Sequence, residues 1–256
     1  MTWAEMLSEW AIPENLLAAA PESPYFFDPQ VFIALADDAI GRAVDTPSDT
    51  EARQALALGT VLDVGCGAGA ASLRLQPHQV VGVDSSSELL AAFDERASKL
   101  GIESAVVEGR WPEVAAETPA CDVVVCHHVF YNTPDLASFV TALHRHARDR
   151  VVVELTAVHP MAWMAPYWEA MYGLDQPKRP VAEDAVAVVV EQLGVEVRQA
   201  RFMRTYQMIG ENGDEALARI GRRLCLPANR YDELRVVIAA SPPPAKREMV
   251  TVAWDV

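Results

Sequence analysis

Apolar and polar positions alternate between two kinds of segment from about residue 60 onward. Residues 123–126 are apolar at successive positions, which is typical of a strand buried on both faces of a parallel sheet. The segment that follows residue 86 instead places Leu89, Phe93 and Ala97 on one stripe at helical spacing. Because short strands and amphipathic helices follow one another in turn, the pattern predicts a doubly wound α/β sheet. Strands are expected near residues 61–64, 80–84, 104–108, 122–126 and 151–155, followed by a C-terminal hairpin near 195–208 and 249–254.

The first 58 residues precede this pattern and are predicted to form an N-terminal helical cap. Trp3 and Trp10 lie on one face at helical spacing, and an aromatic turn around Tyr25 and Phe26 follows. The turn is interpreted either as packing of the cap on the sheet edge or as part of a lid over bound ligands. In the second interpretation, Tyr25 and Phe26 are substrate-binding residues.

Two further segments interrupt the sheet-forming pattern, at residues 156–180 and 211–240. The first is rich in methionine and aromatic residues, among them Trp163 and Trp168. A segment that is apolar on most sides must be buried by the domain, a partner subunit or a ligand. Trp163 and Trp168 are therefore candidates for the wall of a pocket that binds an apolar substrate. With these insertions, residues 59–256 are predicted to form one domain behind the cap.

Three glycines at alternate positions connect the first strand to the next segment. Gly65, Gly67 and Gly69 allow a tight turn that a ligand can approach closely, and a helix is expected to begin directly after them. Asp84 ends the following strand, at the distance expected for an acid that binds a ribose. The pattern also satisfies the dinucleotide motif, which leaves a nicotinamide oxidoreductase as an alternative. The chain has no Tyr-x-x-x-Lys pair to support the common short-chain version of that class.

Charge and composition limit the classes of partner that the chain is expected to bind. Lys and Arg number 21 against 36 Asp and Glu, for a net charge of −15. This balance disfavours binding to nucleic acid or to an anionic membrane, so a small-molecule substrate is expected. The four cysteines show neither a disulfide framework nor paired metal-ligand spacing, and no metal is expected. The sequence shows no signal peptide and no apolar run that could span a bilayer, which favours a cytoplasmic location; a monomer and a homodimer remain open.

The form Asp63-x-Gly65-x-Gly67-x-Gly69 resembles the first motif of class I S-adenosylmethionine-dependent methyltransferases, and residues 80–84 resemble the second. The resemblance implies a Rossmann-like seven-stranded sheet and S-adenosylmethionine as cofactor, with S-adenosylhomocysteine as product. Three shorter segments, 127–132, 154–160 and 222–227, are similar to actinobacterial small-molecule methyltransferases of the methyltransferase type 11/25 kind.

The resemblance also implies roles for individual residues of this chain. The glycine turn, with Asp63 and Cys66, would line the methionine and ribose parts of the cofactor, and Asp84 would accept the ribose hydroxyls. The residues expected beside the adenine or the methionine part are Ser85, Arg110, Trp111 and His127. Arg110 stands where the family most often has Asp, so the adenine contact departs from the family pattern.

Methyl transfer from a sulfonium requires mainly alignment, and a base is needed only for a hydroxyl or a protonated amine. Histidine suits that task because it titrates near neutrality. His128 is the first candidate and His159 the second, with Glu154 a weaker one, while Tyr131 is expected to face the transferred methyl. A protein or RNA methyltransferase and a non-catalytic S-adenosylmethionine-binding protein remain as alternatives.

Overall fold

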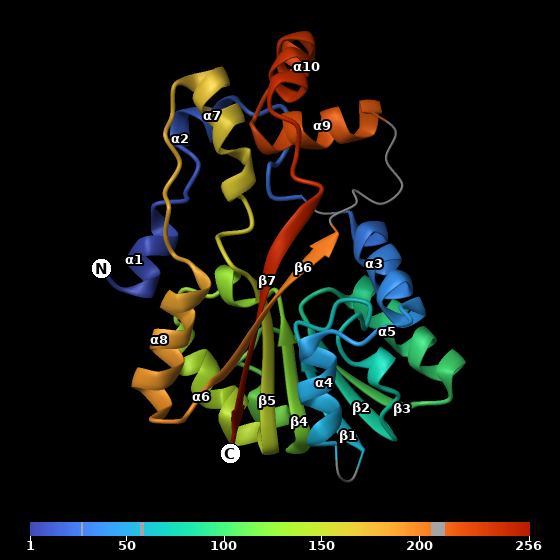
Figure 1. Cartoon of the computed structure of the whole chain (residues 1–256). Coiled ribbons are helices and arrows are strands. Elements are labelled where there is room, and N and C mark those ends of the chain that lie inside the picture. Colours follow the sequence, from blue (N-terminus) through green and yellow to red (C-terminus); the bar gives the residue numbers. More distant parts are fainter. Residues whose placement is uncertain (27, 57–58, 206–212) are drawn as a thin grey trace.

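The computed structural model describes residues 1–26, 28–56, 59–205 and 213–256, and it contains one seven-stranded sheet in the order β3-β2-β1-β4-β5-β7-β6 (Figure 1). Strands β1 to β5 are parallel, β7 is antiparallel to β5, and β6 is antiparallel to β7. The strands are β1 Thr60–Val64, β2 Gln79–Asp84, β3 Glu103–Glu108, β4 Cys121–His127, β5 Ala147–Thr156, β6 Arg198–Thr205 and β7 Lys246–Asp255. The predicted doubly wound sheet of seven strands is confirmed. The end of the strand expected near residue 208 lies outside the described residues.

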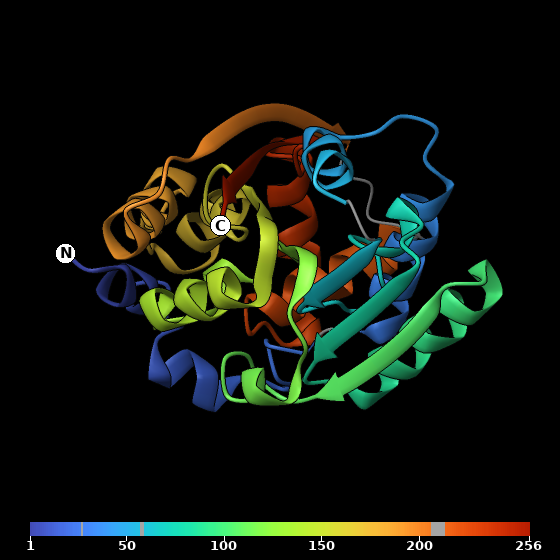
Figure 2. The same ribbon diagram turned by 90° about the horizontal axis from the view of Figure 1, so that it is seen from below.

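Successive side chains of the strands enter two separate cores, because a strand presents alternate residues to opposite faces. Leu62 and Val64 face a core that contains residues of α6 (Leu136–His146) and α8 (Ala182–Leu193). Val61 faces the other core, with residues of α5 (Ser87–Leu100) and α4 (Pro47–Gln54). Figure 2, seen from below, shows the helices distributed on both faces of the sheet.

The strand order reverses between β1 and β4, which places a crevice at the carboxyl ends of these strands. Consecutive strands run outward from β1 toward β3, and the chain then returns to add β4 and β5 on the other side. Ligands of open α/β sheets bind at this kind of switch point. The glycine turn after β1 and the residues after β4 therefore lie at the expected place for a site.

The four N-terminal helices contact different parts of the molecule. Helix α1 (Trp3–Ser8) packs beside α8, α3 (Pro29–Gly41) packs on α5, and α4 packs on β5 and β7. Ile12, just before α2 (Glu14–Ala19), and Leu16 within it join a third apolar cluster. Helix α4 does not follow from an apolar pattern in the sequence, since its residues are mostly polar and it is set by the cap residue Thr46. The boundary at residue 58 stays a prediction.

A helical layer lies over the carboxyl ends of the parallel strands (Figure 1). It consists of η4 (Ala162–Met164) and α7 (Ala165–Tyr172) after β5, and α9 (Gly213–Arg223), η5 (Ala228–Arg230) and α10 (Tyr231–Ala240) after β6. The apolar residues of the first insertion are buried mainly against the second, in a cluster of Met164, Tyr167, Trp168, Met171, Leu217, Ile220, Leu224, Leu226 and Leu234. Of the segment predicted at 211–240, residues 211 and 212 lie outside the described residues.

Candidate active site

The glycine turn is tied to the neighbouring strand by its backbone. The N–H groups of Gly65 and Cys66 both donate to the carbonyl oxygen of Val83 in β2, at 2.8 and 3.0 Å. Gly65 has φ of +71°, and a Cβ built there would lie 2.3 Å from Cγ2 of Val129. Gly67 has φ of +51°, but a Cβ built there would meet nothing within 4 Å. Gly65 is therefore required by packing, whereas Gly67 borders open space.

The helix expected directly after the turn is not there. Residues 68–72 form turns, and only a short 3-10 helix, η1 (Leu73–Leu75), follows. The reason is local, because Gln76 is left-handed and Pro77 comes next. Arg74 of this short helix is also held by an ion pair from its Nε to Oδ1 of Asp49 at 3.1 Å. The turn therefore borders open space at Gly67, and no long helix with its dipole follows directly after it.

Asp84 is held at the end of β2 by two backbone donors. Its Oδ2 accepts from the N–H of Gly67 at 2.9 Å, and its Oδ1 accepts from the N–H of Ser86 at 3.0 Å. Each carboxylate oxygen keeps a further lone pair for a ligand. Ser85 lies exposed beside it. The arrangement is suited to accepting two adjacent hydroxyls, as the sequence predicts for Asp84.

Asp63 is a buried carboxyl group with only one of its oxygens paired. Its Oδ2 accepts from Oγ of Ser72 at 2.6 Å, and its Oδ1 has no hydrogen-bond partner among the described residues. Burial raises the pKa of Asp63 to about 7, and the nearby charge of Asp84 adds to the effect. A buried carboxylate without a cation is costly. A positively charged ligand beside it would remove much of that cost.

The residues expected at the adenine differ in exposure. Arg110 is exposed, whereas Trp111 is buried in the core. The indole Nε1 of Trp111 donates to the carbonyl of Phe139 at 3.4 Å, and its ring meets the His146 ring edge-on at 4.9 Å between centroids. These contacts support a packing role for the Trp111 side chain, and its role beside an adenine stays a prediction.

His128 and Glu154 meet at the carboxyl ends of β4 and β5. Nε2 of His128 lies 3.3 Å from Oε1 of Glu154, and Nη1 of Arg204 lies 2.7 Å from the same oxygen. Glu154 is fully buried, whereas the His128 side chain is 44% exposed. Burial acts to raise the pKa of Glu154, but the contact with His128 and the charges of His127 and Arg204 hold it well below its usual range. The carboxylate is thus charged, and it faces an accessible imidazole.

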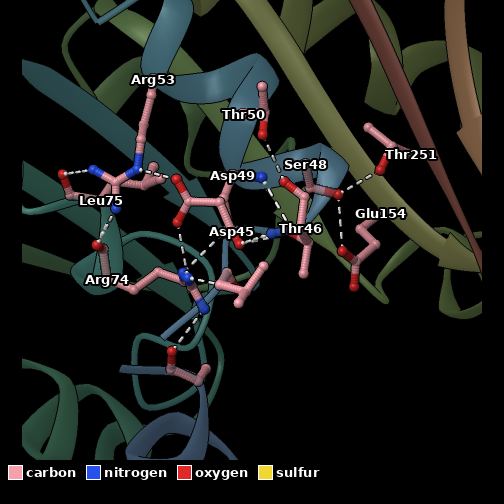
Figure 3. A network of polar contacts seen from close by, with 12 residues as sticks. Asp45, Thr46, Ser48, Asp49, Thr50, Arg53, Arg74, Leu75, Glu154 and Thr251 are labelled. Atoms are coloured by element: carbon pink, nitrogen blue, oxygen red, sulfur yellow. Dashed lines mark hydrogen bonds and ion pairs between the residues drawn. The ribbon is translucent and has the colours of Figure 1, made fainter. Parts of the chain in front are cut away.

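A polar network from α4 and β7 holds the other side of Glu154 (Figure 3). Oγ of Ser48 donates to Oε2 of Glu154 at 2.8 Å and contacts Oγ1 of Thr251 at 2.7 Å. Asp49, the next residue of α4, pairs with Arg74, which lies just after the glycine turn. The sequence did not indicate that Ser48 or Arg204 belongs to the site. The signal available in the sequence was Glu154 itself, a charged residue within the otherwise apolar run 151–155.

Three other predicted residues lie in packed surroundings. His159 stacks on Trp10 with 3.8 Å between ring centroids and meets Tyr131 edge-on at 5.3 Å. The Tyr131 hydroxyl donates to the carbonyl of Thr156 at 2.9 Å. Burial lowers the pKa of both His159 and His127 to about 4. His159 and Tyr131 are therefore grouped with each other and with Trp10, whereas His128 is paired with Glu154.

The predicted substrate-binding aromatics are divided between surface, cavity and core. Tyr25 is exposed, and Trp168 is buried in the helical layer. Phe26 and Trp163 line one cavity between α3, η4 and α9. No cluster of three or more His, Cys, Asp or Glu side chains in the described part of the chain could hold a metal ion. Among the same residues, no helix has the length and apolar character to cross a membrane.

Comparison with known proteins finds similarity to methyltransferases. A family model described as a methyltransferase domain matches residues 61–150. The ubiquinone biosynthesis O-methyltransferase of Serratia proteamaculans is 37% identical over 86 residues, which is 32% of this chain and 36% of that protein. The enzyme of the same name from Pseudomonas paraeruginosa is 29% identical over 153 residues, 58% of this chain and 66% of its own length. The chain thus spans between about a third and two thirds of these relatives.

Solved structures share the fold at low sequence identity. The YcgJ protein from Bacillus subtilis has a TM-score of 0.54 at 15% identity, over 81% of this chain and 97% of its own. The plantazolicin methyltransferase BamL, solved with a triazolic desmethylPZN analog and SAH, has a TM-score of 0.50 at 14% identity, over 98% and 97% of the two chains. The chain therefore carries a methyltransferase domain, and its sequence and fold together support a class I S-adenosylmethionine-dependent methyltransferase.

Proposed function

We propose that this chain transfers a methyl group from S-adenosylmethionine, by in-line displacement, to a small-molecule acceptor. The observation that carries the proposal is the open space at Gly67, which is bordered by the carboxylate of Asp84 and lies in the turn that follows Asp63. S-adenosylmethionine has a ribose with two hydroxyls and two positive charges, on the amine and on the sulfonium. The two carboxylates complement these groups.

The residues present fit this cofactor on structural grounds. The free lone pairs of Asp84 can accept the ribose hydroxyls. The unpaired Oδ1 of Asp63 is a buried acceptor in need of a donor or a cation. When bound, the cofactor supplies an electrophilic methyl group on a good leaving group. The chain itself has to bind, align and exclude water.

His128 is proposed to take a proton from the acceptor. Its Nε2 lies next to the charged carboxylate of Glu154, which stabilises an imidazolium if one forms. The side chain is half-exposed at the carboxyl edge, so it can be reached by a substrate. His159, which stacks on Trp10 and meets Tyr131 edge-on, is a weaker candidate for this role. The other proposed substrate contacts are Tyr25, Phe26, Tyr131, Trp163 and Trp168.

Two observations favour a small acceptor over a nucleic acid. The relatives from Serratia and Pseudomonas are named for ubiquinone biosynthesis, whose substrates are small molecules. The net charge of −15 opposes binding to a polyanion.

Calorimetric titration with S-adenosylmethionine, S-adenosylhomocysteine and NADH tests the cofactor directly. Both adenosyl ligands are expected to bind, and binding of NADH alone would overturn the proposal. Asp84→Ala should lower the affinity for both adenosyl ligands at least about 10-fold, because two hydrogen bonds to a charged group are lost. Glu88→Gln, which removes a nearby exposed carboxylate, is the matched control and should leave the affinity unchanged.

A further inference from the structure

A cavity of about 150 Å³ lies between α3, η4 and α9. Most of its wall is apolar, formed by Phe26, Phe32, Met161, Trp163 and Ile220 among others. A dry cavity of about this size holds a single aromatic ring. The cavity therefore admits one ring rather than a large ligand.

Two of the cavity's walls come from segments that are linked to the candidate active site. Phe32 lines it and also packs against the cluster that contains Ala68 of the glycine turn and Leu89 of α5. Met161 and Trp163 lie in the segment after β5, which ends at Thr156 and carries Glu154, the partner of His128. A ring in this cavity would thus lie between α3, which packs beside the glycine turn, and the segment after β5.

The polar part of the wall is strongly basic, in a chain whose net charge is −15. Three arginines of α9, namely Arg219, Arg222 and Arg223, line the cavity, and Asp28 is the only acidic residue that joins them among the described lining residues. The carboxylate of Asp28 already caps α3, accepting from the N–H of Gln30 at 2.9 Å. Among the described lining residues, basic side chains thus outnumber acidic ones.

Two hydrogen-bond donors of this wall have no acceptor in the part of the chain that the structure describes. Nε of Arg222 and Nε1 of Trp163 are both buried and lack a hydrogen-bond partner within the described ranges. The ion pair of Arg222 is long, 3.7 Å from its Nη1 to Oε2 of the exposed Glu22, and its guanidinium lies 5.0 Å from the Phe26 ring centroid. Buried donors normally have partners. A ligand with acceptor oxygens would supply them.

We propose that the acceptor of the methyl group is a small aromatic acid, with its ring in this cavity and its carboxylate on Arg222 and the indole N–H of Trp163. This inference rests on the proposed methyltransferase function. Arginine binds carboxylates through two parallel hydrogen bonds, which favours a planar anion at this wall. A neutral amide of the same shape cannot make the charged pair.

Binding of paired probes tests the inference without any variant. 4-Hydroxybenzoate and 4-hydroxybenzamide are titrated into the full chain, with and without saturating S-adenosylhomocysteine, and followed by calorimetry. The acid is expected to bind at least about 10-fold more tightly than the amide, which is a difference of about 1.4 kcal/mol. Equal affinities, or no binding of either probe, would overturn the inference. Phenyl phosphate serves as a third probe, and tighter binding of phosphate than of carboxylate would overturn the assignment of the acid.

Variants then test whether Arg222 and Trp163 contact the carboxylate of the probe. Arg222→Gln should lower the affinity for 4-hydroxybenzoate at least about 10-fold, and Trp163→Phe should lower it about 3-fold. In both variants the affinity for 4-hydroxybenzamide should change by less than about 2-fold. Arg235→Gln, an exposed arginine of α10 paired with Asp214, is the matched control and should change neither affinity. An unchanged acid-to-amide ratio in Arg222→Gln would overturn the assignment. Binding of S-adenosylmethionine and S-adenosylhomocysteine is measured separately. A failure of the proposed methyltransferase function can therefore be distinguished from a failure of the proposed carboxylate site.

Discussion

His128 is attached to Glu154 at two points, through its side chain and through its backbone. Nε2 of the imidazole lies 3.3 Å from Oε1 of the carboxylate, and the backbone N–H of His128 donates to the backbone carbonyl of Glu154 at 2.7 Å. The backbone of His128 is left-handed, with φ of +64°. A non-glycine residue in this conformation is strained and is held in place by its surroundings. The two contacts therefore fix the imidazole relative to a buried negative charge.

Glu154→Gln should lower kcat by roughly 10- to 100-fold, because the uncharged amide no longer stabilises a protonated His128. His128→Ala should lower kcat by about as much or more, with little effect on cofactor affinity. The measurement is a double-mutant cycle on kcat, with the melting temperature of each variant as a control for folding. Adding Glu154→Gln to His128→Ala should cost little further activity. Fully additive losses would show that the two residues do not act together.

Binding of S-adenosylmethionine should release protons near neutral pH. In the free protein the raised pKa of Asp63, about 7, leaves this carboxyl partly protonated, whereas a cationic ligand favours the carboxylate. The affinity for S-adenosylmethionine should therefore rise as the pH increases from 6 to 8, by up to about 10-fold for one linked proton. Calorimetry in buffers of different ionisation enthalpy measures the protons released. Asp63→Asn should abolish this part of the release, and an unchanged release in the variant would contradict the role of Asp63.

Gly65→Ala should mainly lower the stability of the fold, whereas Gly67→Ala should mainly lower the affinity for the cofactor. Alanine at position 65 combines a left-handed backbone with a Cβ 2.3 Å from Val129 Cγ2, which should lower the free energy of unfolding by about 2–4 kcal/mol. Alanine at position 67 carries the backbone strain alone, about 1–2 kcal/mol. Its methyl group enters the open space proposed for the cofactor, so the affinity for S-adenosylhomocysteine should fall at least about 10-fold. Thermal unfolding and calorimetry separate the two effects, and tight cofactor binding by Gly67→Ala would place the ligand elsewhere.

His159→Phe should make the protein less sensitive to acid. Burial lowers the pKa of His159 to about 4, so the native state binds fewer protons than the unfolded chain between pH 4 and 6.5. The free energy of unfolding should therefore fall as pH decreases through this window, with about 2–3 kcal/mol of the loss due to His159. Phenylalanine keeps the stacking on Trp10 but cannot be protonated.

Denaturant unfolding at pH 7 and pH 4.5 measures this difference. The gap in unfolding free energy between the two pH values should be smaller in His159→Phe than in the native sequence. His78→Gln, which changes an exposed histidine, serves as the control. An equal gap in His159→Phe and the native chain would show that the buried imidazole is not the acid-sensitive group.

The sequence by itself determined the strands, their alternation with helices, and the place of Asp84, the acid proposed to bind a ribose, at the end of β2. Asp84 and Gly67 are only 17 residues apart, at the ends of two consecutive strands, and their contact follows from the way parallel strands end at one edge. The hydrophobic pattern predicts such features because they depend on local periodicity. The same pattern wrongly predicted a helix directly after Gly69, where a left-handed Gln76 and Pro77 leave room only for a short turn.

Only the tertiary structure decided which residues surround the proposed base and what buries the first insertion. Glu154 meets Ser48 across 106 residues of sequence, and Ser48 meets Thr251 across 203. Trp163 and Arg222 line one cavity although they belong to different insertions. No local pattern encodes such pairs, because they depend on how separately formed elements pack. A serine or an arginine in a polar segment has the same local signal whether it reaches solvent or a buried carboxylate.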